Sequence, residues 1–551
     1  MKIIKILAAS FLVCVGITGC DLTGLNENPN KPTDDVDYNM NEPRLASTLR
    51  GGVIMDGDIE ERSKQLQIDL YSQMTIDGGK WGTKNYIMND EWNSRIWDEY
   101  LKQIASLNIV IRSSIEKDKD LYANSIAVAK IWRVYVHSQA ADKFGPMPFP
   151  AYKEIENNPP YKNLDAIYAE YFAELDDAIN TFNESAGPIF SDSAWDVIFK
   201  GNVDRWKKFA NSLHLRLALR LSEVDITTCK KEVASALANP AGLIENSLDN
   251  ARISVKADGS WGGDYNYTMF QITWGTSANM SKSFEKLVTN IGGIAFPTDL
   301  TNQSSGKHLS NVHPAKADPR APIIFQPAIE NGDWTGIVYG MKMEETNTGI
   351  YQSKQHAELG YIWQAGVPYK SRPYDLFLSE EVHFLKAEAY ARGFVGGDAK
   401  AEYEAGVRAS FSTWGALGAD EYLVSNEKNL AGTSANYDDQ TGSGNTALEK
   451  IITQKYIAAT PDMSQEAWND KRRLNLPRLD VAVYRDPIIY SSYSQDFKDS
   501  RNFIKRIQYP VKEKLVNQDE YNKGVQMLGG NDNVAANLWW DKNANYCTSA
   551  E

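Results

Sequence analysis

Apolar residues recur at helical spacing over much of the chain. Three stretches show the i, i+3, i+4 pattern clearly, at positions Trp97, Leu101, Ile104, Asn108 and Ile111; Ile167, Tyr171, Leu175 and Ala178; and Trp206, Phe209, Leu213, Leu217 and Leu221. Asn163 precedes the second stretch and is a residue type that caps helix N-termini. In the third stretch, Lys and Arg occupy the opposite face. The pattern predicts amphipathic helices packed on one another.

The clearest supersecondary pattern lies between residues 379 and 411. Two helical segments there flank a turn from Gly393 to Gly397, and small alanines on both sides let the helices approach closely. This is the plan of a tetratricopeptide-like hairpin. No strict repeat of about 34 residues recurs, so we expect degenerate hairpins separated by insertions. The predicted fold is mainly α: tetratricopeptide-like helical hairpins forming one scaffold, with long inserted loops and a few short strands.

Two long ranges lack sustained periodicity. Residues 255–375 and 415–445 are rich in Gly, Asn, Ser, Pro and aromatic residues. This composition predicts long ordered loops with a few short strands. Because a rigid scaffold usually carries its binding residues on loops, we expect the binding surface in these ranges.

The N-terminus has the pattern of an export signal. Two lysines precede an apolar run from Ile6 to Val15, which is too short to span a bilayer. Cys20 follows two small residues, and the stretch ITGC resembles the bacterial lipobox, in which the cysteine is alkylated by diacylglycerol and becomes the first residue after cleavage. A plain signal peptide with an incidental cysteine is the alternative.

We therefore expect three parts along the chain. Residues 1–19 are a lipoprotein signal peptide, and residues 20–43 are the lipidated Cys20 with a flexible tether rich in Asn, Asp, Pro and Thr. Residues 44–551 are a helical ligand-binding domain. Two acyl chains would anchor the protein stably, since each buried CH₂ contributes about 0.8 kcal/mol.

Charge and cysteine content limit the function classes. The chain has a formal charge of −14, which disfavours binding to nucleic acid or to anionic membranes by electrostatics. Beyond the leader there is no apolar stretch of about 18 residues or more. Cys229 and Cys547 remain after the leader and the lipidation site; they lack metal-ligand spacing, and their pairing stays open.

The sequence carries no recognisable catalytic or cofactor motif. It has no zinc-protease, nucleophile-elbow or phosphate-loop pattern. His308 and His313 form the only close histidine pair, and their loop context favours solvation over metal binding. We therefore expect no cofactor and no catalysis, and no metal-ligating residue stands out; whether a structural metal such as calcium is bound stays open. A paired-carboxylate glycosidase site stays open, because only carboxyl geometry would identify it.

Aromatic residues gather in the segments without helical period. The 14 Trp and 28 Tyr exceed the 18 Phe, a bias towards rings with a polar tip. Such rings can stack on the apolar face of a sugar while amides and carboxylates pair with its hydroxyls, although rings can also simply pin loops. The candidate ligand-binding residues are Trp81, Tyr86 and Trp92; Trp261, Asp264, Tyr265, Asn266, Tyr267 and Trp274; and Trp334 and Trp363.

Five further stretches share one family pattern. They are QAADKFGPMPFPAYKE (139–154), RWKKFANSLHLRLALRLS (205–222), EEVHFLKAEAYARGF (380–394), the segment from IITQKYIAA to LNLPRL (451–479) and RIQYPVKEKLVNQDEYNKGV (506–525). In this order, and with the lipobox, they resemble SusD/RagB-type outer-membrane lipoproteins. Within them, Gly145 and Pro146 are expected to end a helix, and Trp206 and Trp468 to lie in the core.

The resemblance implies a location and a partner. Such proteins are anchored at the outer membrane, facing the cell exterior, and act with a SusC-like TonB-dependent barrel to take up glycans. On this basis we expect a glycan-binding capture lipoprotein. A peptide-binding, RagB-like protein and a surface glycoside hydrolase are the alternatives.

Overall fold

The computed structural model describes residues 40–549 except 54–58, 60, 78–81, 154–157, 254–277, 342–352, 361–372 and 485–502. The chain divides into a first unit that ends at Asn41 and a second, compact unit, Glu42–Glu551, described here. Helix α2 (Asn41–Gly51) begins before residue 43, where the sequence placed the end of the tether. The division into signal peptide, tether and ligand-binding domain stays a prediction.

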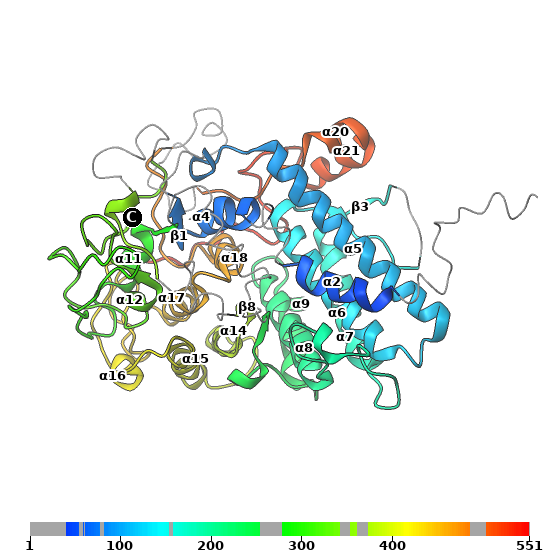
Figure 1. Ribbon diagram of the computed structural model, residues 1–551, viewed down its shortest axis with the longest axis horizontal. Helices are drawn as coiled ribbons and strands as arrows, with labels where there is room; N and C mark the ends of the chain where they lie inside the picture. Colours follow the sequence, from blue (N-terminus) through cyan, green and yellow to red (C-terminus); the bar gives the residue numbers. More distant parts are fainter. Residues whose placement is uncertain are drawn as a thin grey trace, which may run out of the picture. The chain divides into compact units, whose positions relative to one another are not determined.

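Five long helices form the first helical group, in which each helix packs against the next along the chain. Figure 1 shows them side by side, with α5 as the longest. Their amphipathic patterns place apolar residues at the interfaces, as predicted for the three stretches that the sequence singled out. The helices are α5 (Asp90–Asp118), α6 (Ala123–Phe144), α7 (Leu164–Thr181), α8 (Val203–Arg220) and α9 (Ile226–Ala238).

A second helical group follows in the C-terminal half. Helices α14 (Ser379–Ala391) and α15 (Ala399–Trp414) form the predicted hairpin, and the turn includes Gly393 at φ +64°, in the left-handed region that favours glycine. Helix α14 also packs on α17 (Ala447–Ala459), which packs on α18 (Ser464–Leu474). Contacts between α14 and α8 join the two groups.

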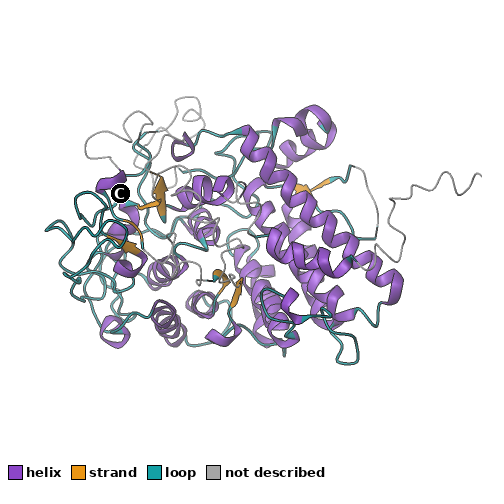
Figure 2. Cartoon of the chain, in the orientation of Figure 1, coloured by secondary structure: helices purple, strands orange, loops and turns teal. Residues whose placement is uncertain are grey.

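Short elements complete the described part of the chain. Figure 2 shows that most loops and strands lie beside the second helical group. The additional helices are α4 (Asp69–Ser72), α11 (Lys282–Val288), α12 (Ala321–Ile324), α16 (Ala419–Leu423), α20 (Val511–Val516) and α21 (Gln518–Met527), with a π-helix η2 (Glu61–Ile68) and 3-10 turns η3 (Gly82–Asn85), η4 (Ser193–Trp195), η5 (Ser247–Asp249) and η9 (Ser353–Gln355). The described parts of both predicted loop ranges contain only short elements of this kind, which confirms their loop character.

Within the described residues, the strands form three small antiparallel sheets. One has the order β1-β5-β7-β6, and the other two are the pairs β2-β3 and β4-β8. The strands are β1 (Thr75–Asp77), β2 (Met147–Pro148), β3 (Tyr161–Lys162), β4 (Ala251–Ile253), β5 (Ala278–Met280), β6 (Phe325–Gln326), β7 (Glu358–Leu359) and β8 (Tyr374–Phe377). The mainly α fold with inserted loops and few short strands is thus confirmed.

Several local predictions can be checked directly. Helix α6 ends at Gly145, whose φ of +95° lies in the glycine region, as predicted. Trp206 and Trp468 are fully buried core residues, also as predicted. Cys229 and Cys547 are free cysteines, so the disulfide that the sequence left open does not form.

Candidate functional site

Trp334, predicted to bind a ligand, lies in the hydrophobic core. Its side chain is 0% exposed, its indole Nε1 donates a hydrogen bond to the carbonyl oxygen of Phe325 at 3.0 Å, and its ring packs on Phe296 with a centroid distance of 4.9 Å. A buried ring has no face open to a sugar. The prediction for Trp334 is therefore wrong in this structure, and the residue holds its loop onto the body.

Tyr86 and Trp92 are buried as well. Tyr86 is 1% exposed and lies between the rings of Tyr71 and Tyr339, with centroid distances of 6.5 and 6.3 Å. Trp92, in the first turn of α5, is 5% exposed and packs on Leu66 of η2. Both rings fasten the segment before α5 to its neighbours, so neither presents a face to a ligand.

The other predicted site residues lie outside the described residues. Their ligand-binding role stays a prediction, and they are Trp81, Trp261, Asp264, Tyr265, Asn266, Tyr267, Trp274 and Trp363. The structure does describe the strands that border the segments carrying these residues. The pairing of these strands shows which segments have neighbouring ends.

The β1-β5 ladder joins two of the aromatic segments at one end. Asp77, the last residue of β1, is paired with Ala278, the first residue of β5. The chain therefore leaves β1 towards Trp81 at the same end of the ladder at which it arrives from Trp274. Each tryptophan is four residues from its strand, a reach of at most about 14 Å per segment.

The β4-β8 ladder likewise places the ends of two aromatic segments side by side. Ile253, the last residue of β4, is paired with Tyr374, the first residue of β8. The segment that carries Trp261 thus starts beside the point where the segment that carries Trp363 ends. Because residues 254–277 connect the two ladders, three aromatic segments far apart in sequence are tied together at strand ends.

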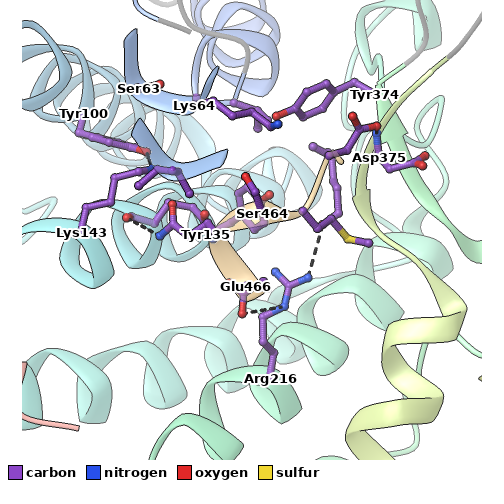
Figure 3. A pocket seen from close by; sticks show the side chains of 18 residues that line it. Ser63, Lys64, Tyr100, Tyr135, Lys143, Arg216, Tyr374, Asp375, Ser464 and Glu466 are labelled. Atoms are coloured by element: carbon purple, nitrogen blue, oxygen red, sulfur yellow. Dashed lines mark hydrogen bonds and ion pairs between the residues drawn. The ribbon is translucent and has the colours of Figure 1, made fainter. Parts of the chain in front are cut away.

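A polar cavity of about 70 Å³ lies where the two helical groups meet. Figure 3 shows side chains from both groups around it. The labelled lining residues are Ser63 and Lys64 of η2, Tyr100 of α5, Tyr135 and Lys143 of α6, Arg216 of α8, Tyr374 and Asp375 of β8, and Ser464 and Glu466 of α18.

Ion pairs fix the charges at this cavity. Arg216 donates two hydrogen bonds to Glu381, from Nε at 2.9 Å and from Nη2 at 2.7 Å, and Arg220 Nη2 donates to Glu466 Oε2 at 2.6 Å. Burial by itself would raise the pKa of Glu466, but Arg220 and Arg216 outweigh it and hold that pKa at about 2. Glu466 therefore stays ionised near neutral pH and cannot serve as a proton donor there.

The size of the cavity decides what it can hold. Ligand pockets typically have volumes of about 300–1,000 Å³, whereas a water needs only about 10–15 Å³ of such a cavity. About 70 Å³ thus accommodates several waters and no sugar ring. We interpret the cavity as a hydrated polar joint between the two helical groups.

A glycosidase acid would need a carboxyl group with a raised pKa that faces the substrate. Among the described residues, burial raises the pKa of Asp142, Glu174 and Glu380. Asp142 accepts hydrogen bonds from Tyr168 Oη at 2.7 Å and Trp540 Nε1 at 3.0 Å. Asp142 and Glu380 are 1% and 0% exposed, and Glu174 is paired with Arg133. These three carboxyl groups therefore take part in the packing of the helices.

The described part of the chain holds no group of three or more His, Cys, Asp or Glu side chains that could bind a metal ion. Of the histidine pair, His308 Nδ1 lies 3.0 Å from Thr301 Oγ1, and His313 stacks on Phe296. None of the described helices is long and apolar enough to cross a membrane.

Sequence reasoning missed the residues of the polar joint. Arg216 and Glu381 are 165 positions apart, and Arg220 and Glu466 are 246 apart. One sequence feature could have pointed to these residues, namely the run of charged residues in α18. Such a run is typical of a solvent-exposed face, but every residue of this helix is buried. Buried charges require partners, so a charged helix that contains a core tryptophan, Trp468, could have indicated such a network.

Comparison with known proteins places the chain in a family. A family model described as "Starch-binding associating with outer membrane" matches residues 52–510. A SusD homologue from Parabacteroides distasonis is 69% identical, covers 93% of this chain and 100% of its own, and has a TM-score of 0.90. A SusD homologue from Bacteroides vulgatus is 25% identical, with 93% and 99% covered and a TM-score of 0.75.

Similarity in fold extends further. A chitin-binding SusD homologue from Flavobacterium johnsoniae is 24% identical, with 92% of this chain and 99% of that chain covered and a TM-score of 0.73. A comparison with curated proteins gave no match. The family model spans most of the compact unit, and the helical scaffold is the one that these homologues share; the chain belongs to the SusD-like family.

Proposed function

We propose that this protein is a glycan-capture lipoprotein of the outer membrane, which binds oligo- or polysaccharide and passes it to a SusC-like TonB-dependent transporter. The observation that carries the proposal is the match of residues 52–510 to a starch-binding, outer-membrane-associated family. The acidic charge and the absence of catalytic motifs are compatible with capture without turnover. Binding energy then serves retention, with no selectivity for a transition state.

Cys20 provides the anchor in this proposal. It follows an apolar run and two small residues in the lipobox-like stretch ITGC. A diacylated cysteine supplies two acyl chains, which is the minimum for stable membrane attachment. The anchor leaves the folded body free to face the exterior of the cell.

The ligand platform is proposed on the segments that leave the β1-β5 and β4-β8 ladders. The pairing of Asp77 with Ala278 and of Ile253 with Tyr374 brings their ends together. Among their residues, Trp81, Trp261, Trp274 and Trp363 offer flat rings, while Asp264 and Asn266 offer groups for sugar hydroxyls. The buried Tyr86, Trp92 and Trp334 are left out of the platform.

Calorimetry of the full chain carrying Cys20→Ala tests the proposal. It is titrated with oligosaccharides from starch, chitin, cellulose, xylan and mannan and with a peptide mixture. Saturable heat with at least one glycan, without new reducing ends afterwards, is the expected result. Heat with peptides alone would favour the RagB-like alternative, and new reducing ends would identify a glycosidase.

A further inference from the structure

The C-terminal segment presents one tryptophan outward between two buried residues. Leu538 and Trp540 are 1% and 0% exposed, and Trp540 Nε1 donates a hydrogen bond to Asp142 at 3.0 Å. Asp541 closes the turn, since its backbone N–H donates to Leu538 O at 2.9 Å and its carboxylate pairs with Lys505 at 3.0 Å. The turn is thus fixed from both sides, and Trp539 between them is only partly buried.

Trp539 lines a cleft of about 400 Å³, which is within the usual range of ligand pockets, about 300–1,000 Å³. The N-terminal end of α7 and the C-terminal end of α21 form its other walls. Pro146, Leu164 and Leu538 supply apolar surface. The ring of Trp539 is positioned by Tyr168, with a centroid distance of 6.2 Å.

The polar groups of this cleft are available to a ligand. The side chains of Asn163, Asn537 and Lys542 make no hydrogen bond or ion pair with any described residue, and the indole N–H of Trp539 donates to none of them. Together they supply donors and acceptors around one aromatic face. Asn163 and Lys542 are exposed, and Asn537 and Trp539 are half-buried, so these groups face solvent and a ligand can reach them.

We propose that the Trp539 cleft is a second carbohydrate-contact site. A pyranose would lay its apolar C–H face on the indole while its hydroxyls pair with the two asparagine amides and with Lys542. An extended peptide would instead need a free strand edge or deep apolar side-chain pockets, and the cleft is bordered by helix ends and a tight turn. The ligand class rests on the proposed function; the location does not.

The cleft lies apart from the β1-β5 ladder, at which two of the platform segments meet the described chain. In Figure 1, α21, whose C-terminal end forms one wall of the cleft, lies apart from β1. A single polysaccharide that touched both sites would gain from multivalency, because the second contact becomes intramolecular. Long glycans should therefore be held more firmly than short ones, which suits a capture protein.

Fluorine NMR of the full chain carrying Cys20→Ala and 5-fluorotryptophan tests this site. The Trp539 signal is assigned by its loss in Trp539→Phe, and that of Trp195, which is 38% exposed and outside the cleft, by Trp195→Phe. The probes are oligosaccharides from starch, chitin, cellulose, xylan and mannan. We expect saturable movement of the Trp539 signal with at least one probe and none of the Trp195 signal.

The variant Asn537→Ala should weaken that saturation about threefold to tenfold, the effect of losing one hydrogen bond. If other tryptophan signals moved and the Trp539 signal did not, the assignment of the cleft as a carbohydrate-contact site would be overturned. The proposed function would stand. Equal, unsaturated movement of Trp539 and Trp195 would also overturn the assignment of the cleft. If no tryptophan signal moved with any glycan, the proposed function would fail together with the cleft.

Discussion

Replacement of Trp334 separates a core role from a ligand-binding role. The residue is fully buried against Phe296 and hydrogen bonded to the carbonyl of Phe325. Trp334→Ala removes this packing, leaves a cavity and deprives a buried carbonyl of its donor. Changes of buried Trp or Phe to Ala cost about 3–5 kcal/mol, and we expect the free energy of unfolding to fall by that amount.

Urea denaturation followed by circular dichroism measures this loss. Trp334→Phe keeps a ring in the core and should cost less, about 1–3 kcal/mol. As a control, Trp195→Ala changes a tryptophan that is 38% exposed, and should cost about 0.5 kcal/mol. Glycan affinity should be unchanged in Trp334→Phe. Full stability of Trp334→Ala with lost glycan binding would refute the core assignment and return the ring to the ligand site.

Three further predictions concern stability and anchoring. Gly336→Ala should cost about 1–3 kcal/mol in urea denaturation, because its methyl group would lie 2.4 Å from a backbone oxygen; Gly396→Ala, with nothing within 4 Å, should be near neutral. Burial alone would lower the pKa of His214, but Asp176 and Glu232 outweigh it and raise that pKa. The free energy of unfolding that His214→Gln loses should therefore be largest at pH 5 and shrink as the pH rises through the raised pKa. A loss that does not change with pH would contradict the ion pairing. Cys20→Ala should move the protein from the membrane to the soluble fraction, and persistence in the membrane would contradict the anchor.

Much of the scaffold could be predicted because it depends on local pattern. The 379–411 hairpin shows both helical periods and its glycine turn within one continuous stretch, and α14 and α15 follow it closely. Gly145 likewise ends α6 through its own backbone conformation. Helix spacing and turn chemistry need only neighbouring residues, so one sequence suffices to read them.

The candidate site was predicted less well because burial depends on distant partners. Trp334 and the predicted loop rings look alike in sequence, since each stands among Gly and polar residues. Only the approach of Phe296 and Phe325 turns Trp334 into a core residue. Similarly, no local pattern reveals that Asp77 pairs with Ala278, because β1 and β5 have three residues each.

The buried charges of α18 show the same limit. Lys471, Arg472 and Arg473 read as a solvated run, yet all three are at most 2% exposed. Arg473 pairs with Glu388 and Asp470, and Arg472 lies 3.6 Å from the ring centre of Trp468. Asp470 and Trp468 lie on α18 itself, whereas Glu388 lies on α14, and Arg472 Nη1 also donates to the carbonyl oxygen of Lys505 at 2.9 Å. The burial of the helix therefore depends on tertiary contacts as well as on its own residues.

The central claim is that the aromatic segments joined at the β1-β5 and β4-β8 ladders bind glycan. Calorimetry with the best oligosaccharide of the panel, comparing the Cys20→Ala chain with the same chain carrying Trp261→Ala and Trp274→Ala, tests it most directly. We predict at least a tenfold loss of affinity, about 1.4 kcal/mol or more, with an unchanged urea midpoint. Unchanged saturable binding in that variant would contradict the claim.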